Sequence, residues 1–227
     1  ATGQFAGIPM NILGDKKTAD YVCTGSWSKK AISQAKAFCD VNVVAQPESF
    51  TTVPAQSEWK TNPDAAYLHT CHNETIEGVE FPFIPETGDV PLVSDFSSTI
   101  LSRPIDVSKF GIIYAGTQKN IGPAGMAVVI VREDLIGKAS AVTPNVLNYE
   151  KMADNDSMLN TPPTFTWYMA GMVFSYLKEL GGLEKVAEIN KRKSDKLYAA
   201  IDGSSFYGSP VDPTCRSWMN VPFTLAD

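Results

Sequence analysis

The stretch that decides the fold carries a lysine in a polar, glycine-rich turn: Tyr114-Ala115-Gly116-Thr117-Gln118-Lys119-Asn120-Ile121-Gly122-Pro123-Ala124-Gly125. Apolar residues 110–114 enter it and apolar residues 126–131 leave it, and both runs are typical of short strands. A lysine held by a short loop near a sheet loses hydration, which makes its amine nucleophilic. Lys119 therefore meets the requirement for a Schiff base with an aldehyde cofactor, although a solvated surface lysine is the commoner explanation of such a residue alone.

Further short apolar runs are typical of buried strands in a sheet that is covered on both faces. The predicted strands, besides the two that flank the turn, are residues 19–24, 41–45, 67–70 and 92–95. Helical spacing predicts helices over residues 3–13, 26–38, 166–180 and 183–201. Ser26 is the expected N-cap of the second helix, and residues 216–225 are expected to form a strand of a further unit.

Composition excludes several classes of protein. The 227 residues are 44% hydrophobic and carry a formal net charge of -6, which argues against a nucleic-acid or anionic-membrane surface. Four widely spaced cysteines contain no C-x-x-C pair, so we expect a reducing compartment: the cytoplasm, or a plastid if the source is photosynthetic. No apolar run is long enough to span a bilayer.

Polar residues at the ends of the predicted strands are candidates for the site. In open α/β sheets ligands bind outside the carboxyl ends of the strands, where Asp95 closes the run 92–95. An aspartate there suits a protonated ring nitrogen, although it equally suits a cap on the turn 97–99. Trp27, at a predicted helix start, would stack on an aromatic ring or pack in the core.

The remaining candidates are weaker when each is taken alone. Thr75 would donate a hydrogen bond to a phenolic oxygen, or it is an ordinary loop threonine. His69 and His72 lack a third ligand nearby, so we expect them to pack at strand ends and predict no metal site. Residues 1–4 enter a helix whose free N–H groups suit a phosphate, and Gln118 adds an amide donor.

A later polar loop, residues 160–164, precedes a predicted helix and contains Asn160 and Thr161. Its simplest explanation is a helix N-cap followed by proline in the first turn.

Six segments together resemble the phosphoserine aminotransferase family of class V pyridoxal-phosphate aminotransferases. They are Gly3-Gln4-Phe5, Thr24-Gly25-Ser26-Trp27, Asn73-Glu74-Thr75-Ile76-Glu77-Gly78, Asp95-Phe96-Ser97-Ser98-Thr99-Ile100, Gln118-Lys119-Asn120-Ile121-Gly122-Pro123-Ala124-Gly125 and Asn160-Thr161-Pro162-Pro163-Thr164. The resemblance implies an α/β fold with three α/β/α layers and a mainly parallel seven-stranded sheet, the large domain of the aspartate-aminotransferase (fold-type I) enzymes. It implies that residues 1–214 are this cofactor-binding domain without its N-terminal part, and that residues 215–227 begin a truncated small domain.

The same resemblance implies a homodimer with pyridoxal 5'-phosphate shared between subunits. By similarity, Lys119 carries the cofactor as a Schiff base, Asp95 pairs with its ring nitrogen, Trp27 stacks on the ring and Thr75 contacts the phenolic oxygen. The implied phosphate contacts are Ala1, Thr2 and Gln118, with Asn160 and Thr161 reaching the neighbouring subunit's cofactor.

The implied reaction is reversible amino transfer between L-glutamate and 3-phosphohydroxypyruvate, which gives 2-oxoglutarate and O-phospho-L-serine in serine biosynthesis. The family's substrate-binding arginine and histidine lie outside the matched segment, and none of the chain's four arginines, Arg103, Arg132, Arg192 and Arg216, matches them. One alternative is a truncated, catalytically impaired form that binds cofactor or dimerises. Another is a different fold-type I enzyme, such as a cysteine desulfurase or a kynureninase-like hydrolase, against which residues 118–120 argue.

Overall fold

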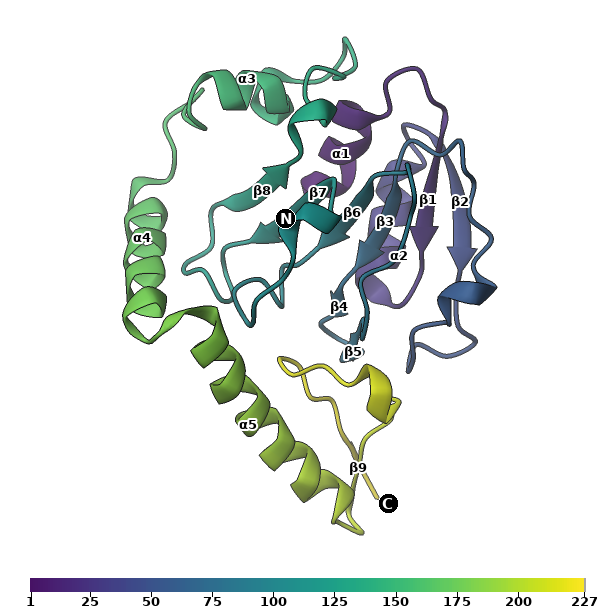
Figure 1. The fold of residues 1–227 in the computed structure, drawn as a ribbon, viewed down its shortest axis with the longest axis vertical. Helices are drawn as coiled ribbons and strands as arrows, with labels where there is room; N and C mark the ends of the chain where they lie inside the picture. Colours follow the sequence, from purple (N-terminus) through teal and green to yellow (C-terminus); the bar gives the residue numbers. More distant parts are fainter. Residues whose placement is uncertain (227) are drawn as a thin grey trace.

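A six-stranded sheet forms the centre of the molecule, with the strand order β2-β1-β3-β6-β7-β8 (Figure 1). The computed structural model describes residues 1–226. The strands are β1 Thr18–Val22, β2 Asp40–Ala45, β3 Leu68–Cys71, β6 Leu92–Asp95, β7 Ile112–Gly116 and β8 Ala127–Val131. All neighbours pair in parallel except β7 and β8. The predicted α/β fold with a mainly parallel sheet is confirmed, with six strands among the described residues where the resemblance implied seven.

Two helices near the start of the chain cover one face of this sheet. Phe5, Ile8 and Ile12 of α1 share a buried cluster with Ala31 and Ile32 of α2 and with side chains of the sheet. The opposite face packs mainly against loop side chains. The helices are α1 Gln4–Ile12, α2 Ser26–Ala35, α3 Tyr149–Asp154, α4 Thr164–Glu179 and α5 Gly182–Asp202.

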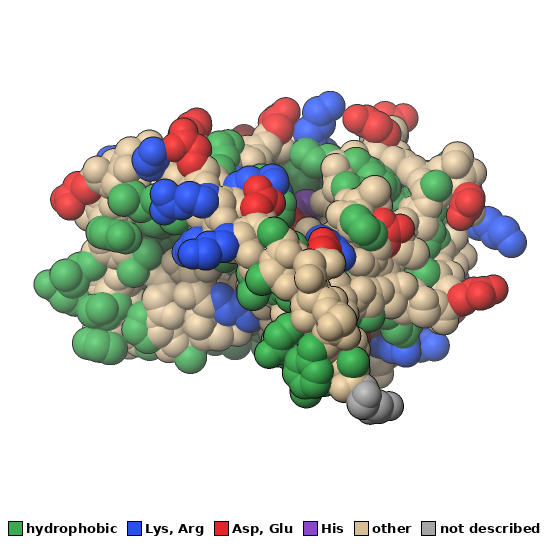
Figure 2. Space-filling view, turned by 90° about the horizontal axis from the view of Figure 1, so that it is seen from below, with side chains coloured by type: hydrophobic (Ala, Val, Ile, Leu, Met, Phe, Trp, Pro, Cys, Tyr) green, Lys and Arg blue, Asp and Glu red, His purple; other side chains and the backbone are tan. Residues whose placement is uncertain are grey.

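The later helices lie along one side of the molecule, where α4 leads into α5 (Figure 1). Apolar side chains gather on the surface at the end where α4 lies (Figure 2). None of the five helices within residues 1–226 combines the length and the apolar character that a membrane crossing requires. Short 3-10 turns occur at Gln56–Glu58, Val107–Lys109, Glu133–Leu135, Asn145–Leu147 and Pro213–Cys215.

A small hairpin follows β3 and packs against the C-terminal segment. It consists of the antiparallel strands β4 Asn73–Glu74 and β5 Val79–Glu80. Most of residues 216–225 is not the expected strand: it is an irregular segment whose Ser217 N–H donates to Gly78 O at 3.0 Å. Arg216 forms an isolated antiparallel bridge with Val79, and β10 Thr224–Leu225 pairs with β9 Tyr207–Gly208. Asp227, the last residue of the predicted segment 215–227, lies outside the described residues.

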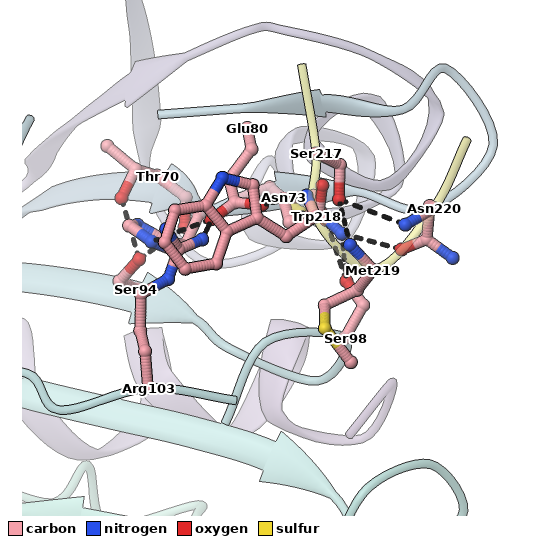
Figure 3. Close-up of polar contacts among 12 residues, drawn as sticks. Thr70, Asn73, Glu80, Ser94, Ser98, Arg103, Ser217, Trp218, Met219 and Asn220 are labelled. Atoms are coloured by element: carbon pink, nitrogen blue, oxygen red, sulfur yellow. Dashed lines mark hydrogen bonds and ion pairs between the residues drawn. The ribbon is translucent and has the colours of Figure 1, made fainter. Parts of the chain in front are cut away.

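The buried carboxylate of Glu80 links the hairpin to this C-terminal segment (Figure 3). Glu80 is 4% exposed, forms an ion pair with Arg103, and accepts a hydrogen bond of 3.2 Å from the Trp218 N–H. The Arg103 guanidinium also lies 3.8 Å from the centre of the Trp218 ring. Burial and the Arg103 charge lower the pKa of the neighbouring His72 to about 3, so His72 is neutral. These contacts join the hairpin to the C-terminal segment.

The close approach of the hairpin to the C-terminal segment predicts a large effect for Gly78→Ala. Gly78 has a positive φ of 70°, and a β-carbon there would overlap Pro222 and lie 2.9 Å from Asn220 O. We expect the free energy of unfolding, measured by urea titration, to fall by about 3 kcal/mol.

Gly88→Ala is the matched control, because Gly88 also has a positive φ but a β-carbon there meets nothing within 4 Å. It should cost only the left-handed backbone conformation, about 1 kcal/mol. Equal losses in the two variants would contradict the close packing of Gly78 against Pro222 and Asn220.

Candidate active site

A small cavity lies beyond the carboxyl ends of β3, β6 and β7. Seven of the predicted site residues line it: Ala1, Thr2, Trp27, Thr75, Asp95, Gln118 and Lys119. Five further residues, which sequence reasoning missed, complete the lining: Phe5, Cys71, Asn73, Ser97 and Ser98. Ser97 and Ser98 directly follow Asp95, so the turn-forming pattern there was the signal that could have found them. Residues from distant parts of the sequence therefore meet at one point.

Lys119 reaches across the cavity to the hairpin. Its Nζ donates a hydrogen bond of 2.7 Å to Thr75 Oγ1. The side chain remains accessible to solvent at the cavity mouth, so the predicted desolvation of this lysine is only partial. Partial burial lowers the pKa of Lys119, and the negative charge of Asp95 opposes that shift. A larger fraction of the amine is thus uncharged than in an ordinary surface lysine.

Asp95 ends the central strand β6 and is 5% exposed. Its Oδ1 accepts hydrogen bonds from the Ser97 N–H at 2.8 Å and from Ser97 Oγ at 2.5 Å. The turn-capping explanation is therefore correct for one carboxylate oxygen, while Oδ2 has no hydrogen-bond partner among residues 1–226. Burial raises the pKa of Asp95, and the hydrogen bonds from Ser97 oppose the rise.

Trp27 is the second residue of α2, and its half-buried ring both lines the cavity and packs against the core cluster beneath α1 and α2. The Lys30 ammonium lies 4.1 Å from the centre of the Trp27 ring. Trp27 Nε1 is buried without a hydrogen-bond partner in the described chain. The expected N-cap Ser26 is wrong: Gly25 occupies that position, and the Trp27 N–H is bonded instead to the Glu74 carboxylate.

The start of α1 supplies backbone donors to the cavity. Gln4 and Phe5 already donate their N–H groups to Ala1 O and Thr2 O. The N–H groups of Thr2 and Gly3 have no partner among the described residues, and α1 has no side-chain cap. Uncapped N–H groups at a helix N-terminus favour an anion such as a phosphate.

Asn160 and Thr161 do not line this cavity. Both are exposed, and Asn160 borders a separate groove beside Gln4, Gly125 and Trp167. The simple N-cap explanation does not hold for them either, because the N-cap position of α4 is Pro163 and no side chain caps the helix.

Of the two histidines, His69 is buried and His72 is partly buried. His69 Nε2 lies 2.8 Å from the Tyr114 hydroxyl, and His72 stacks on Phe96 with ring centres 4.2 Å apart. Within residues 1–226 no group of three or more histidine, cysteine, aspartate or glutamate side chains is arranged to hold a metal ion.

Comparisons with known proteins identify what the chain is similar to. The family model described as Aminotransferase class-V matches residues 1–227. A phosphoserine aminotransferase from Hahella chejuensis is 58% identical over 229 residues, and one from Pseudomonas aeruginosa is 57% identical. Both alignments cover 100% of this chain, and the chain spans 63% of the length of these curated relatives.

Comparison with solved structures also finds phosphoserine aminotransferases. The phosphoserine aminotransferase from Bacillus circulans subsp. alkalophilus is 48% identical with a TM-score of 0.96, over 100% of this chain and 63% of its own. A phosphoserine aminotransferase from Trichomonas vaginalis, solved with PLP bound, is 42% identical with a TM-score of 0.94, over 100% of this chain and 64% of its own. An alanine–glyoxylate aminotransferase from Nostoc, 16% identical with a TM-score of 0.77, shares the fold.

The environment of Lys119 predicts a distinctive titration. After reductive methylation of the lysine amines with 13C-formaldehyde, the NMR signal of Lys119 should titrate below the ordinary lysine pKa, because burial disfavours its charged form. Asp95→Asn should lower that pKa further, since it removes a negative charge that stabilises the ammonium. An ordinary pKa for Lys119, or a rise in Asp95→Asn, would contradict this electrostatic description.

Proposed function

The chain belongs to the class-V aminotransferase family, and we propose on that premise that it is the pyridoxal-phosphate-binding part of a phosphoserine aminotransferase. One observation carries the proposal. Lys119, Thr75, Asp95 and Trp27 come from four separate elements and line a single cavity at the carboxyl edge of the sheet.

The groups around this cavity fit pyridoxal 5'-phosphate. Lys119 offers an amine of lowered pKa, and Asp95 offers a carboxylate oxygen that the Ser97 turn leaves unused. The Trp27 ring has one face against Lys30 and a buried Nε1 without a partner. The free N–H groups of Thr2 and Gly3, together with the Gln118 amide, suit the phosphate.

When bound, pyridoxal phosphate supplies an aldehyde and a ring that accepts the electron pair released at the α-carbon of an amino acid. The chain's own residues then have separable tasks. Lys119 Nζ takes a proton as a general base and returns it as an acid, and Thr75 Oγ1 orients that nitrogen. Asp95 would hold a proton on a ring nitrogen of the bound group, and the Trp27 ring would stack against it.

We assign to the complete enzyme reversible amino transfer between L-glutamate and 3-phosphohydroxypyruvate, giving 2-oxoglutarate and O-phospho-L-serine in serine biosynthesis. The relatives at 57% and 58% identity are named phosphoserine aminotransferase, which supports O-phospho-L-serine as one of the reactants. Residues 1–214 are then the large cofactor-binding domain and residues 215–227 the start of a small domain. Four cysteines without a disulfide in the described chain support a reducing compartment, for which we propose the cytoplasm.

A second candidate is a form that binds the cofactor without turning over a substrate. The positions of the arginines favour this candidate. A phosphorylated keto acid carries two anionic groups, which bind best to bidentate arginine side chains. Among the described residues no arginine lines the cavity. Arg103, Arg132 and Arg216 are instead paired with Glu80, Asp134 and Asp202.

We also propose a homodimer in which Asn160 and Thr161 reach the cofactor of the neighbouring subunit. Their exposure away from their own chain's cavity supports this. The adjacent helix α4 presents an apolar stripe on one face, at the end of the molecule where Figure 2 shows apolar side chains. Its members, at helical spacing, are Phe165, Tyr168, Met172 and Tyr176, which are 50–67% exposed.

The proposed cofactor predicts a spectroscopic result. Pyridoxal phosphate added to this chain should give a visible absorbance band that borohydride removes, because its aldehyde condenses with the Lys119 amine. Lys119→Ala should abolish the band, whereas Lys138→Ala, an exposed lysine outside the cavity, should leave it unchanged. A band that survives Lys119→Ala would refute the assignment of this lysine. A band that forms but does not respond to L-glutamate would favour the form that only binds the cofactor.

The proposed dimer predicts a change in mass on disrupting the apolar stripe. The unmodified chain should sediment as a dimer, and Tyr168→Glu combined with Met172→Glu should sediment as a monomer because it places two charges in the apolar contact. Val107→Glu changes an exposed apolar residue that lies outside the stripe and should remain dimeric. A monomeric unmodified chain, or a dimer that survives the double change, would argue against this interface.

A further inference from the structure

Glu74 is a fully buried carboxylate beside the cavity, with an exposed fraction of 0%, and the proposed function assigns it no task. It lies in β4, immediately before Thr75. Its two oxygens accept separate hydrogen bonds from α2: Oε2 from the Trp27 N–H at 2.8 Å and Oε1 from the Ser28 N–H at 2.9 Å. One side chain therefore joins two cavity-lining residues, Trp27 and Thr75, that are 48 positions apart in the sequence.

The Glu74 carboxylate takes the role that an N-cap side chain usually has at the start of α2. The N-cap residue is Gly25, which has no side chain that could accept a hydrogen bond from the first turn. Glu74 supplies the acceptor from another part of the chain, and its negative charge faces the positive end of the helix dipole. A β-carbon on Gly25 would lie 2.7 Å from Cγ and Cδ of Glu74 and 2.7 Å from Oε2 of Glu77, so the close approach of the hairpin requires glycine at position 25.

The strand that carries Glu74 is itself fixed. Asn73 Nδ2 donates to Ser98 Oγ at 2.8 Å and to Asn220 Oδ1 at 2.7 Å, which ties the hairpin to the loop after β6 and to the C-terminal segment (Figure 3). Asn73 is bonded to the loop after β6 and to the C-terminal segment, and Glu74 is bonded to α2. The position of Trp27 therefore depends on the position of the hairpin. Thr75, the next residue, contacts Lys119 from the same hairpin.

We propose that Glu74 is a positioning residue. Through its two hydrogen bonds to the N-terminus of α2, it fixes the position of Trp27 relative to Thr75 at the cavity. This inference rests on the proposed function only for the identity of the ligand in the cavity, pyridoxal phosphate. A glutamine in place of Glu74 has the same shape but offers one acceptor oxygen and one amide donor, so one of the two N–H groups must face a donor.

The test compares Glu74→Gln with Glu77→Gln. Glu77 lies in the same hairpin and accepts hydrogen bonds from the N–H and hydroxyl of Ser26, whereas the N–H groups of Trp27 and Ser28 are bonded to Glu74. In the cofactor-free chain, amide hydrogen exchange at Trp27 and Ser28 should accelerate at least tenfold in Glu74→Gln and less than twofold in Glu77→Gln. Unchanged exchange at both amides in Glu74→Gln would overturn the proposal.

Cofactor affinity provides the second readout, from quenching of tryptophan fluorescence by pyridoxal phosphate. Glu74→Gln should weaken binding about tenfold, and it should have no further effect in a Trp27→Ala, Thr75→Ala background, because a positioning residue acts only through the residues that it positions. In that background binding is followed by equilibrium dialysis. A loss that simply adds to the loss in the background would mean that Glu74 acts by another route, which overturns the proposal.

Gly25→Ala perturbs the same contact with the carboxylate retained, and it carries the test if Glu74→Gln fails to fold. Because its β-carbon also meets Glu77 Oε2, its effect is compared with that of Glu77→Gln. It should accelerate exchange at Trp27 and Ser28 and weaken cofactor binding as Glu74→Gln does, and normal values for both would overturn the proposal. The two claims remain distinguishable. An unmodified chain that binds no pyridoxal phosphate contradicts the proposed function, while hydrogen exchange still decides the role of Glu74.

Discussion

The parallel pairing of β3, β6 and β7 is the constraint on which the site depends. Cys71 lies opposite Asp95, and Asp95 lies opposite Tyr114, so the three strands reach the same edge of the sheet together. The segments that leave them are the hairpin with Thr75, the turn with Ser97 and the turn with Lys119. Because the strand register fixes where these three segments begin, Thr75, Ser97 and Lys119 face one cavity although they are distant in sequence. Trp27 comes from α2 and is joined to the hairpin by the Glu74 carboxylate.

Buried carboxylates then set the details of the site. Asp95, Glu74 and Glu80 are each at most 5% exposed, and burial alone would disfavour their charged forms. For each carboxylate a different partner offsets the free-energy cost of burial. The Ser97 turn does so for Asp95, two N–H groups of α2 for Glu74, and Arg103 for Glu80. Removing one partner from such a group leaves an unsatisfied buried acceptor, so these contacts specify one arrangement of the hairpin, the helix and the sheet.

Sequence patterns predicted much of this architecture. Residues 92–95 form a strand with the predicted bounds, and seven predicted site residues line one cavity. The antiparallel direction of β8 could not be predicted, because the apolar run 126–131 has the same periodicity in either direction. Ser26 failed as an N-cap because the acceptor comes from Glu74, 46 positions or more away, which no local rule detects. Asn160 and Thr161 remain proposals, since their assigned contact involves a second chain.

The most direct test of the central claim is to locate the bound cofactor. Incubation of the chain with pyridoxal phosphate, reduction with borohydride and peptide mass spectrometry would show which lysine is modified. We expect one phosphopyridoxyl group per chain, on the peptide that contains Lys119, at cofactor concentrations that leave other lysines unmodified. Modification spread over exposed lysines, or none at Lys119, would contradict the claim that the converging strand ends form a cofactor site.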